Sequence, residues 1–129
     1  MSSNLLKYWF EIICVSTLYF VTAKIGQQFA IPPGNITPVW LPSGIMVALV
    51  IIRGYGIWPG IFIGAFIGNA SAYIDFNSVN LIFSACASAS FNGLGDTLGI
   101  VGSVYILNKL SHKPINTFFN LASFWQFVM

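Results

Sequence analysis

The fold of this chain is decided by residues 31–69, which read IPPGNITPVWLPSGIMVALVIIRGYGIWPGIFIGAFIGN. Prolines and glycines interrupt the first part of this stretch, yet no charged residue occurs from Gln27 to Ile52. A loop in water would be polar, whereas this one is apolar and lies between hydrophobic segments. Irregular backbone at membrane depth persists only where protein or a water-filled cavity satisfies its polar groups. The stretch is therefore expected to be a close-fitting plug or the wall of a site.

The composition points to a membrane without reference to any motif. The chain is 57% hydrophobic and 6% charged, with a mean hydropathy of +0.81, whereas soluble domains are about one quarter charged. The net charge of +2 is spread out and forms no basic cluster, which argues against a nucleic-acid partner. Cys14 and Cys86 both lie in apolar segments, where they are expected to act as small hydrophobic residues rather than as a disulfide or metal site.

Several motifs resemble the first family of bacterial membrane-associated sensor domains, MASE type one. They are Pro32-Pro33-Gly34, residues 38–45 (PVWLPSGI), residues 58–66 (WPGIFIGAF), residues 95–98 (GDTL) and residues 102–107 (GSVYIL). The family pattern more often reads Gly-Asn-Thr-Leu-Glu at the fourth motif, so the chain departs from it at Asp96 and Gly99.

The resemblance extends from about Leu18 to the end of the chain. It implies an integral membrane sensory input domain, of which this chain corresponds to the first half. In the resembling family the cytoplasmic output domain is often a histidine kinase, a diguanylate cyclase or a phosphodiesterase. No such output domain is expected within this chain.

The apolar segments predict a single all-α domain, a polytopic membrane bundle with four complete spans and part of a fifth. The expected spans are residues 5–23, 40–52, 57–73 and 79–110, with an incomplete fifth at 115–129. The fourth is so long that it must tilt, protrude or kink, and Asn92-Gly93 is the expected weak point. Because the fifth is unfinished at Met129, we expect a fragment of a larger polytopic protein.

Positive charge predicts the orientation of these spans. If the N-terminus is cytoplasmic, then Lys7, Arg53, Lys109 and Lys113 lie inside and only Lys24 lies outside. This distribution favours a cytoplasmic N-terminus in a bacterial inner membrane.

The interrupted stretch is a candidate ligand pocket open to the outer side. A helix that starts at Pro42 and ends at Ile52 would be short, and its first N–H groups, at Ser43, Gly44 and Ile45, would be free to bind polar ligands. A start at Pro38 would add one turn. With either start, residues 33–44 would line the pocket, with Trp40 as an aromatic wall and Asn35 or Thr37 as polar contacts. The alternative is a rigid external loop folded over the bundle.

Asp96 is the strongest single candidate for a functional residue. It is expected near mid-membrane, where an ionisable group is costly and is by default a functional hypothesis. Asn92 lies one turn away on the same face, and Asn69 could approach from the third span. The alternative is a neutral acid that hydrogen-bonds helices together. The candidate ligand-sensing residues are thus Asn35, Thr37, Trp40, Ser43, Gly44, Asn69, Asn92 and Asp96.

Small residues at intervals of four predict close helix packing. They are Gly60, Gly64 and Gly68 in the third span, and Ala85, Ala89, Gly93, Gly95 and Gly99 in the fourth. Packing within one domain is the favoured interpretation, and a homodimer face or a sliding surface is the alternative. Glu11 lies four residues after Lys7, so the two are expected to form a structural pair.

The leading interpretation is signal input, in which a small ligand or a membrane state is sensed within the bundle and passed to a cytoplasmic output domain. A small transporter, or the substrate-binding membrane subunit of one, is the alternative, and a packing subunit without ligand is a third. No catalytic constellation, cofactor motif or metal cluster is recognised, and His112 lies in a basic loop. The expected partners are therefore the lipid bilayer, the output domain and an unknown small ligand.

Overall fold

The computed structural model describes residues 3–31, 37, 39–73 and 78–110. Over these residues the chain is all-α, as predicted, with no strand. The elements are α1 (Ser3–Gln27), α2 (Leu41–Arg53), the 3-10 turn η1 (Tyr55–Ile57), α3 (Trp58–Tyr73) and α4 (Val79–Leu110). The expected fifth segment, the loop residue Asn35 and the basic-loop residues His112 and Lys113 lie outside the described residues.

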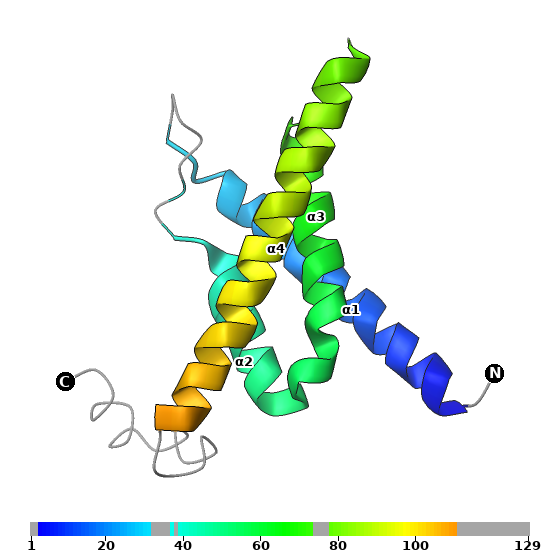
Figure 1. Cartoon of the computed structure of the whole chain (residues 1–129), viewed down its shortest axis with the longest axis vertical. Coiled ribbons are helices and arrows are strands. Elements are labelled where there is room, and N and C mark those ends of the chain that lie inside the picture. The colour runs from blue at the N-terminus through cyan, green and yellow to red at the C-terminus, as the bar shows by residue number, and fades with distance from the viewer. Residues whose placement is uncertain (1–2, 32–36, 38, 74–77, 111–129) are drawn as a thin grey trace.

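The helices run alternately up and down (Figure 1). α3 packs against α1 and α4, and α2 contacts the same two helices. The N-terminal end of α1, the α2–α3 turn and the C-terminal end of α4 therefore point to one end of the bundle. The α1 C-terminus and the α4 N-terminus point to the other.

The short second helix forms as the sequence predicts, with its start beside Pro42 rather than at Pro38. Trp40 precedes the helix in an extended conformation, and Pro42 lies in the first turn, where its missing N–H costs little. The helix ends at Gly54, whose φ of 86° is the left-handed conformation that glycine adopts without strain. Its 13 residues rise about 20 Å, which is less than the hydrocarbon thickness of a bilayer.

Glycines bring α3 unusually close to α1. A Cβ atom added at Gly64 would lie 2.6 Å from Tyr19 Cβ and 2.7 Å from the Ser16 carbonyl oxygen. One added at Gly60 would lie 2.9 Å from the Ile12 carbonyl oxygen. Neither position has room for a side chain, so the two helix backbones meet directly along this line. Gly68 continues it against α1 with ordinary contact distances.

The small residues of α4 divide between two faces. Gly93 packs on α3, where an added Cβ would lie 3.4 Å from the Phe62 ring, and Ala85 and Ala89 are buried. Gly95 and Gly99 are exposed, and an added Cβ would meet no atom within 4 Å. The expected packing role of these two glycines is thus not seen in the described part of the chain. Gly95 follows Gly93 by two residues, about 200° around the helix, so it faces away from α3.

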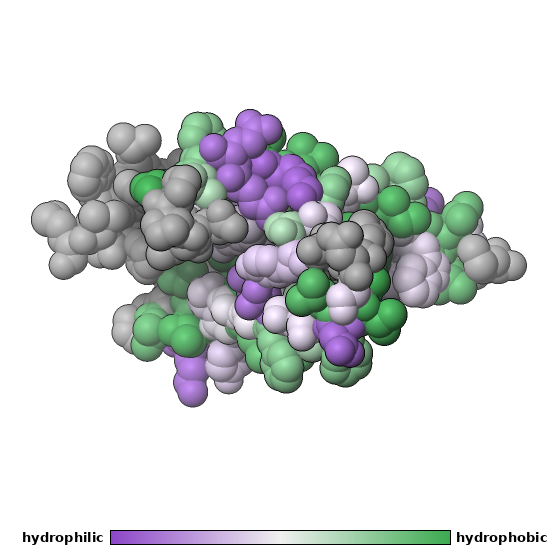
Figure 2. All heavy atoms as spheres, turned by 90° about the horizontal axis from the view of Figure 1, so that it is seen from above, coloured by the Kyte–Doolittle hydropathy of each residue, from purple (hydrophilic) through white to green (hydrophobic). Residues whose placement is uncertain are grey.

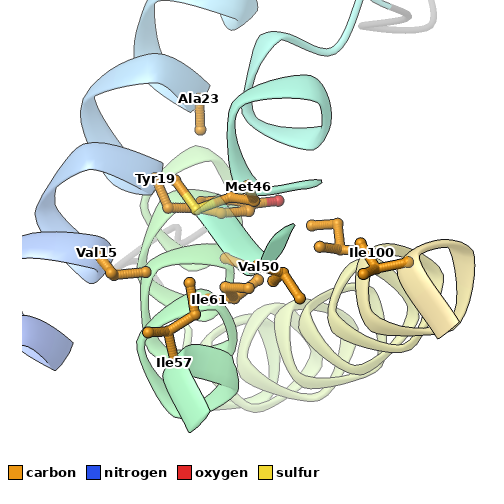
Figure 3. Packing of buried hydrophobic residues seen from close by; sticks show 10 residues of the cluster. Val15, Tyr19, Ala23, Met46, Val50, Ile57, Ile61 and Ile100 are labelled. Atoms are coloured by element: carbon orange, nitrogen blue, oxygen red, sulfur yellow. The ribbon is translucent and has the colours of Figure 1, made fainter. Parts of the chain in front are cut away.

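The core lies where the helices converge (Figure 3). Tyr19 of α1, Met46 and Val50 of α2, Ile61 of α3 and Ile100 of α4 are all buried there. Because each helix contributes a side chain, the core fixes the position of α2 between α1 and α4.

α4 is one continuous helix of 32 residues that runs through Asn92-Gly93 without a break. At 1.5 Å per residue it is about 48 Å long, which exceeds the apolar thickness of a bilayer of about 30 Å. The segment was expected to tilt, protrude or kink at Asn92-Gly93. The helix is not broken there, so tilt or protrusion remains.

Large hydrophobic side chains are exposed along the outer faces of the helices. Phe10, Phe83 and Leu98 are 68%, 74% and 70% exposed, and Figure 2, an end-on view, shows hydrophobic residues around much of the rim. By length and composition α1 is the one described helix that could cross a membrane, and α2 is apolar but shorter. This criterion does not give the four spans expected, because α2 and α3 have 13 and 16 residues and polar residues dilute the hydropathy of α4.

Polar contacts tie together the helix ends at the Arg53 end of the bundle. Arg53 Nε donates to Glu11 Oε1 at 2.6 Å, so the partner of Glu11 is Arg53 of α2 and not Lys7 as expected. The Tyr8 hydroxyl donates to the Gly56 carbonyl at 3.3 Å. Asn108 Nδ2 donates to the Tyr55 hydroxyl at 2.9 Å. These bonds join α1, the α2–α3 turn and α4.

We expect Gly64→Ala to destabilise the fold by about 1–3 kcal/mol, because the new methyl group would overlap backbone and Cβ atoms of α1. Gly99→Ala is the matched control. It adds the same methyl group to a helix interior in open space, and should be neutral or stabilising by up to about 1 kcal/mol. Thermal unfolding of both variants, followed by circular dichroism in detergent, measures the difference. Equal stability of the two variants would contradict the close α1–α3 contact.

Candidate functional site

A chain of hydrogen bonds links α1, the start of α2 and α4 in the middle of the bundle. Trp40 Nε1 donates to the Tyr19 hydroxyl oxygen at 3.2 Å. The Tyr19 hydroxyl donates to Asp96 Oδ2 at 2.5 Å. The Tyr19 side chain is fully buried and Asp96 is half-buried. Three residues that are far apart in sequence thus form one polar unit inside an apolar core.

The direction of these bonds follows from the chemistry of tryptophan. An indole N–H can only donate, so the Tyr19 oxygen must accept from Trp40. The single hydroxyl proton of Tyr19 is then free to point only to Asp96, which accepts it. Trp40 therefore orients Tyr19, and Tyr19 holds Asp96 in place.

An open cleft of about 500 Å³ lies beside this unit. Its lining combines candidates from three parts of the sequence, namely the residues around the start of α2, Asn69 of α3 and the middle of α4. The lining residues are Trp40, Ser43, Asn69, Phe91, Asn92, Gly95 and Asp96. The structure thus brings together Trp40, Ser43, Asn69, Asn92 and Asp96, all of which were candidates from the sequence. Gly95, expected to pack against a helix, instead forms part of the cleft wall.

Asn69 and Asn92 take different positions in this cleft. Asn69 is buried, and its Nδ2 donates to the Ala65 carbonyl one turn earlier at 2.9 Å. This bond uses one of the two N–H groups of the amide. Asn92 is exposed one turn before Asp96 on the same helix, as the spacing predicts.

Gly44 and Thr37, the other candidates among the described residues, do not line the cleft. Gly44 is exposed, with no atom within 4 Å of an added Cβ, and Thr37 is half-buried. The N–H of Ser43 donates to the Trp40 carbonyl at 3.2 Å, so this amide is not free as expected. The start of α2 therefore contributes the side chains of Trp40 and Ser43 to the cleft.

Tyr19 is the residue that sequence reasoning missed. It lies inside the first apolar segment, whereas the other tyrosines of the helical region fall near helix ends. A buried tyrosine usually finds a partner for its hydroxyl. Tyr19 lies four residues before the expected end of the first span at Ala23 but eight residues before the observed end of α1 at Gln27. The expected bounds therefore hid the signal that a polar partner approaches it from another helix.

The residue content of the site argues against a metal centre within the described residues, where no group of three histidine, cysteine, aspartate or glutamate side chains comes together. Of the described residues of these four types, Asp96 alone lines the cleft.

A family model, MASE1, matches residues 12–129, nearly the whole chain. The chain belongs to the MASE1 family. MASE1 is a family of membrane-associated sensory domains, so the resemblance carried by the proline- and glycine-rich motifs is confirmed. No curated protein and no solved structure matches the sequence. The cleft is therefore a polar site within a membrane-associated sensory domain.

We expect the Tyr19–Asp96 hydrogen bond to appear as coupling between two substitutions. Tyr19→Phe removes the hydroxyl and keeps the ring, and Asp96→Leu removes the acceptor while keeping a side chain of similar size. A double-mutant cycle on the free energy of unfolding should give a coupling of about 0.5–3 kcal/mol. As a control, Tyr8→Phe combined with Asp96→Leu should be additive within about 0.5 kcal/mol, because Tyr8 bonds the α2–α3 turn. Additivity in both cycles would refute the bond.

Proposed function

We propose that this chain is the membrane-embedded sensory input part of a bacterial signal-transduction protein, and that the cleft beside Asp96 is its sensing site. The observation that carries the proposal is the convergence of polar side chains from three helical segments on one open cleft in an otherwise apolar bundle. Concave sites with a few convergent polar groups are typical of ligand binding. Membership of a sensory domain family supports the same conclusion.

The proposed arrangement in the membrane is multi-pass, with the N-terminus in the cytoplasm. The exposed apolar side chains around the bundle support it, because a surface of this kind is rare on soluble proteins. The distribution of charge supports the orientation. The hydrogen bonds of Tyr8, Arg53 and Asn108 place Lys7, Arg53 and Lys109 near one end of the bundle. Positive charge of this kind marks the cytoplasmic side.

A ligand in the cleft would touch three helices at once. It would contact Trp40 and Ser43 at the start of α2, Asn69 of α3 and Asp96 of α4. A stimulus shifts a conformational equilibrium only if it binds two arrangements with different affinity. Contacts to three separate helices provide this difference in affinity, because any change in the spacing of the helices alters the site. The proposed output is a cytoplasmic histidine kinase or cyclic-di-GMP enzyme outside this chain. This chain itself would not catalyse a reaction.

A transporter is the second candidate. The extended entry into a short α2 and the acid in the middle of α4 are features of substrate sites in secondary transporters. Uptake and signalling are separable, because a transporter with an altered cleft loses substrate flux, whereas a sensor changes the activity of its output domain.

We expect cysteine labelling to distinguish the two ends of the bundle. In a background with Cys14→Ser and Cys86→Ser, Phe29→Cys lies after α1 on an exposed residue and should react with a membrane-impermeant maleimide in intact cells. Gly56→Cys, exposed in the α2–α3 turn, should react only after the membrane is permeabilised. Labelling of both residues from the same side would contradict the proposed topology.

We expect substitutions in the polar unit to change the output of the full-length protein. Asp96→Asn and Tyr19→Phe should each shift the activity of the output domain by about fivefold or more, the usual range for coupling between sites. Gly99→Ala, on the exposed face of the same helix, should leave the activity unchanged. The activity is measured in membranes at equal protein levels. Unchanged activity in both site variants would exclude the cleft as the sensing site.

A further inference from the structure

We propose that the cleft beside Asp96 binds a small organic cation, such as an amine or a quaternary ammonium compound. The inference rests on the proposed function of this cleft as the sensing site and adds the chemical class of its ligand. Three features of the lining carry it, namely the sign of its charge, the hydrogen-bonding groups left unused and the aromatic walls.

Among the described residues, the charge of the lining is negative. Asp96 is the one charged residue of that part of the chain that lines the cleft. The basic residues of the described chain lie elsewhere. Lys7, Arg53 and Lys109 lie toward the opposite end of α1, α2 and α4 from the cleft, and Lys24 Nζ donates to Gln27 Oε1 at 3.2 Å. Since no basic residue is among the described residues of the lining, an anionic ligand would meet no counter-charge in this wall, whereas a cation would meet the Asp96 carboxylate.

Some of the polar groups in and beside the lining already form hydrogen bonds. The Trp40 N–H donates to Tyr19, the Tyr19 O–H to Asp96, and one of the two Asn69 amide N–H groups to the Ala65 carbonyl. Among the described residues, the side chains of Ser43 and Asn92 donate no hydrogen bond. The acceptors are not used up. Among the described residues, Asp96 accepts a hydrogen bond from Tyr19 at Oδ2, which leaves Oδ1 facing the cleft lining, and Asn69 takes part through its Nδ2 alone. Spare acceptors favour a ligand that donates, as a primary ammonium group does. A quaternary ammonium group has no N–H and would instead be held by the Asp96 charge and by the aromatic rings.

Two aromatic side chains complete the site. Trp40 and Phe91 both line the cleft. Aromatic rings attract cations through their negative faces, and tryptophan does so most strongly. The indole N–H of Trp40 is held by Tyr19, so its ring is fixed in orientation before a ligand arrives. An ordered ring beside a carboxylate is the combination that recognises ammonium groups.

The test compares two probes of the same shape in the full-length protein in lipid nanodiscs. Choline carries a quaternary ammonium group, and 3,3-dimethylbutan-1-ol replaces its nitrogen with carbon and has no charge. We expect titration calorimetry to show choline, or the primary amine ethylammonium, binding about tenfold or more tightly than the neutral alcohol. Equal binding of cation and alcohol, no binding of either cation, or tighter binding of propionate would overturn the proposal.

Variants then locate the binding. Asp96→Asn should weaken cation binding about tenfold or more and leave the binding of the alcohol unchanged. Glu11→Gln is the matched control, since it removes a carboxylate outside the cleft that pairs with Arg53, and cation binding should persist. Phe91→Leu changes a side chain that is 75% exposed and should fold normally. Phe91→Leu should weaken cation binding several-fold, which keeps the test decisive even if Asp96→Asn is unstable. Full affinity in Phe91→Leu and in a folded Asp96→Asn would refute the site.

The outcomes separate this inference from the proposed function. If Asp96→Asn alters the output but no cation binds, the cleft is a sensing site and the ligand class is wrong. If cations bind in an Asp96-dependent manner without any change in output, the ligand class is right and the sensing function is wrong.

Discussion

The rest of this structure depends on the direct contact between the backbones of α1 and α3. At Gly60 and Gly64 there is no room for a Cβ atom, so α3 lies against the peptide groups of α1 rather than against its side chains. Helices in membranes associate through such close packing because lipid provides no hydrophobic force between them. With α3 held this close to the Cβ of Tyr19, the ring of Tyr19 extends into the core shared with α2 and α4, where its hydroxyl reaches Asp96.

The polar unit of Trp40, Tyr19 and Asp96 gives the bundle a specificity that apolar contacts lack. Hydrophobic side chains can pack in several registers, whereas a hydrogen-bonded chain is satisfied only when all members are in place. Each of the three residues comes from a different segment. The directional hydrogen bonds therefore fix the start of α2 and the middle of α4 relative to α1, in addition to the packing of the apolar side chains. The cleft is the part of this arrangement that remains open to a ligand.

Much of the fold could be predicted from the sequence, because proline and glycine mark the ends of its apolar segments. The start of α2 beside Pro42 and its end at Gly54 are local properties of the backbone. The relation between helices is not local. The spacing of Gly95 and Gly99 resembles that of Gly60 and Gly64, but spacing does not reveal which face meets a neighbour. The partner of Glu11 proved to be Arg53, 42 residues away, for the same reason.

The candidate site could be predicted in part. Asp96, Asn92, Asn69 and Trp40 stand out because polar or amphipathic residues in apolar surroundings need partners, and the structure places them around one cleft. Tyr19 did not stand out, since its ring suits an apolar core.

One consequence concerns the hydrogen bond between Asn108 and Tyr55. This bond holds the C-terminal end of α4 to the α2–α3 turn, so α4 can pivot about it. Asp96 lies 12 residues before Asn108, a lever arm of about 18 Å, so widening the cleft by about 1 Å corresponds to a tilt of roughly 3°.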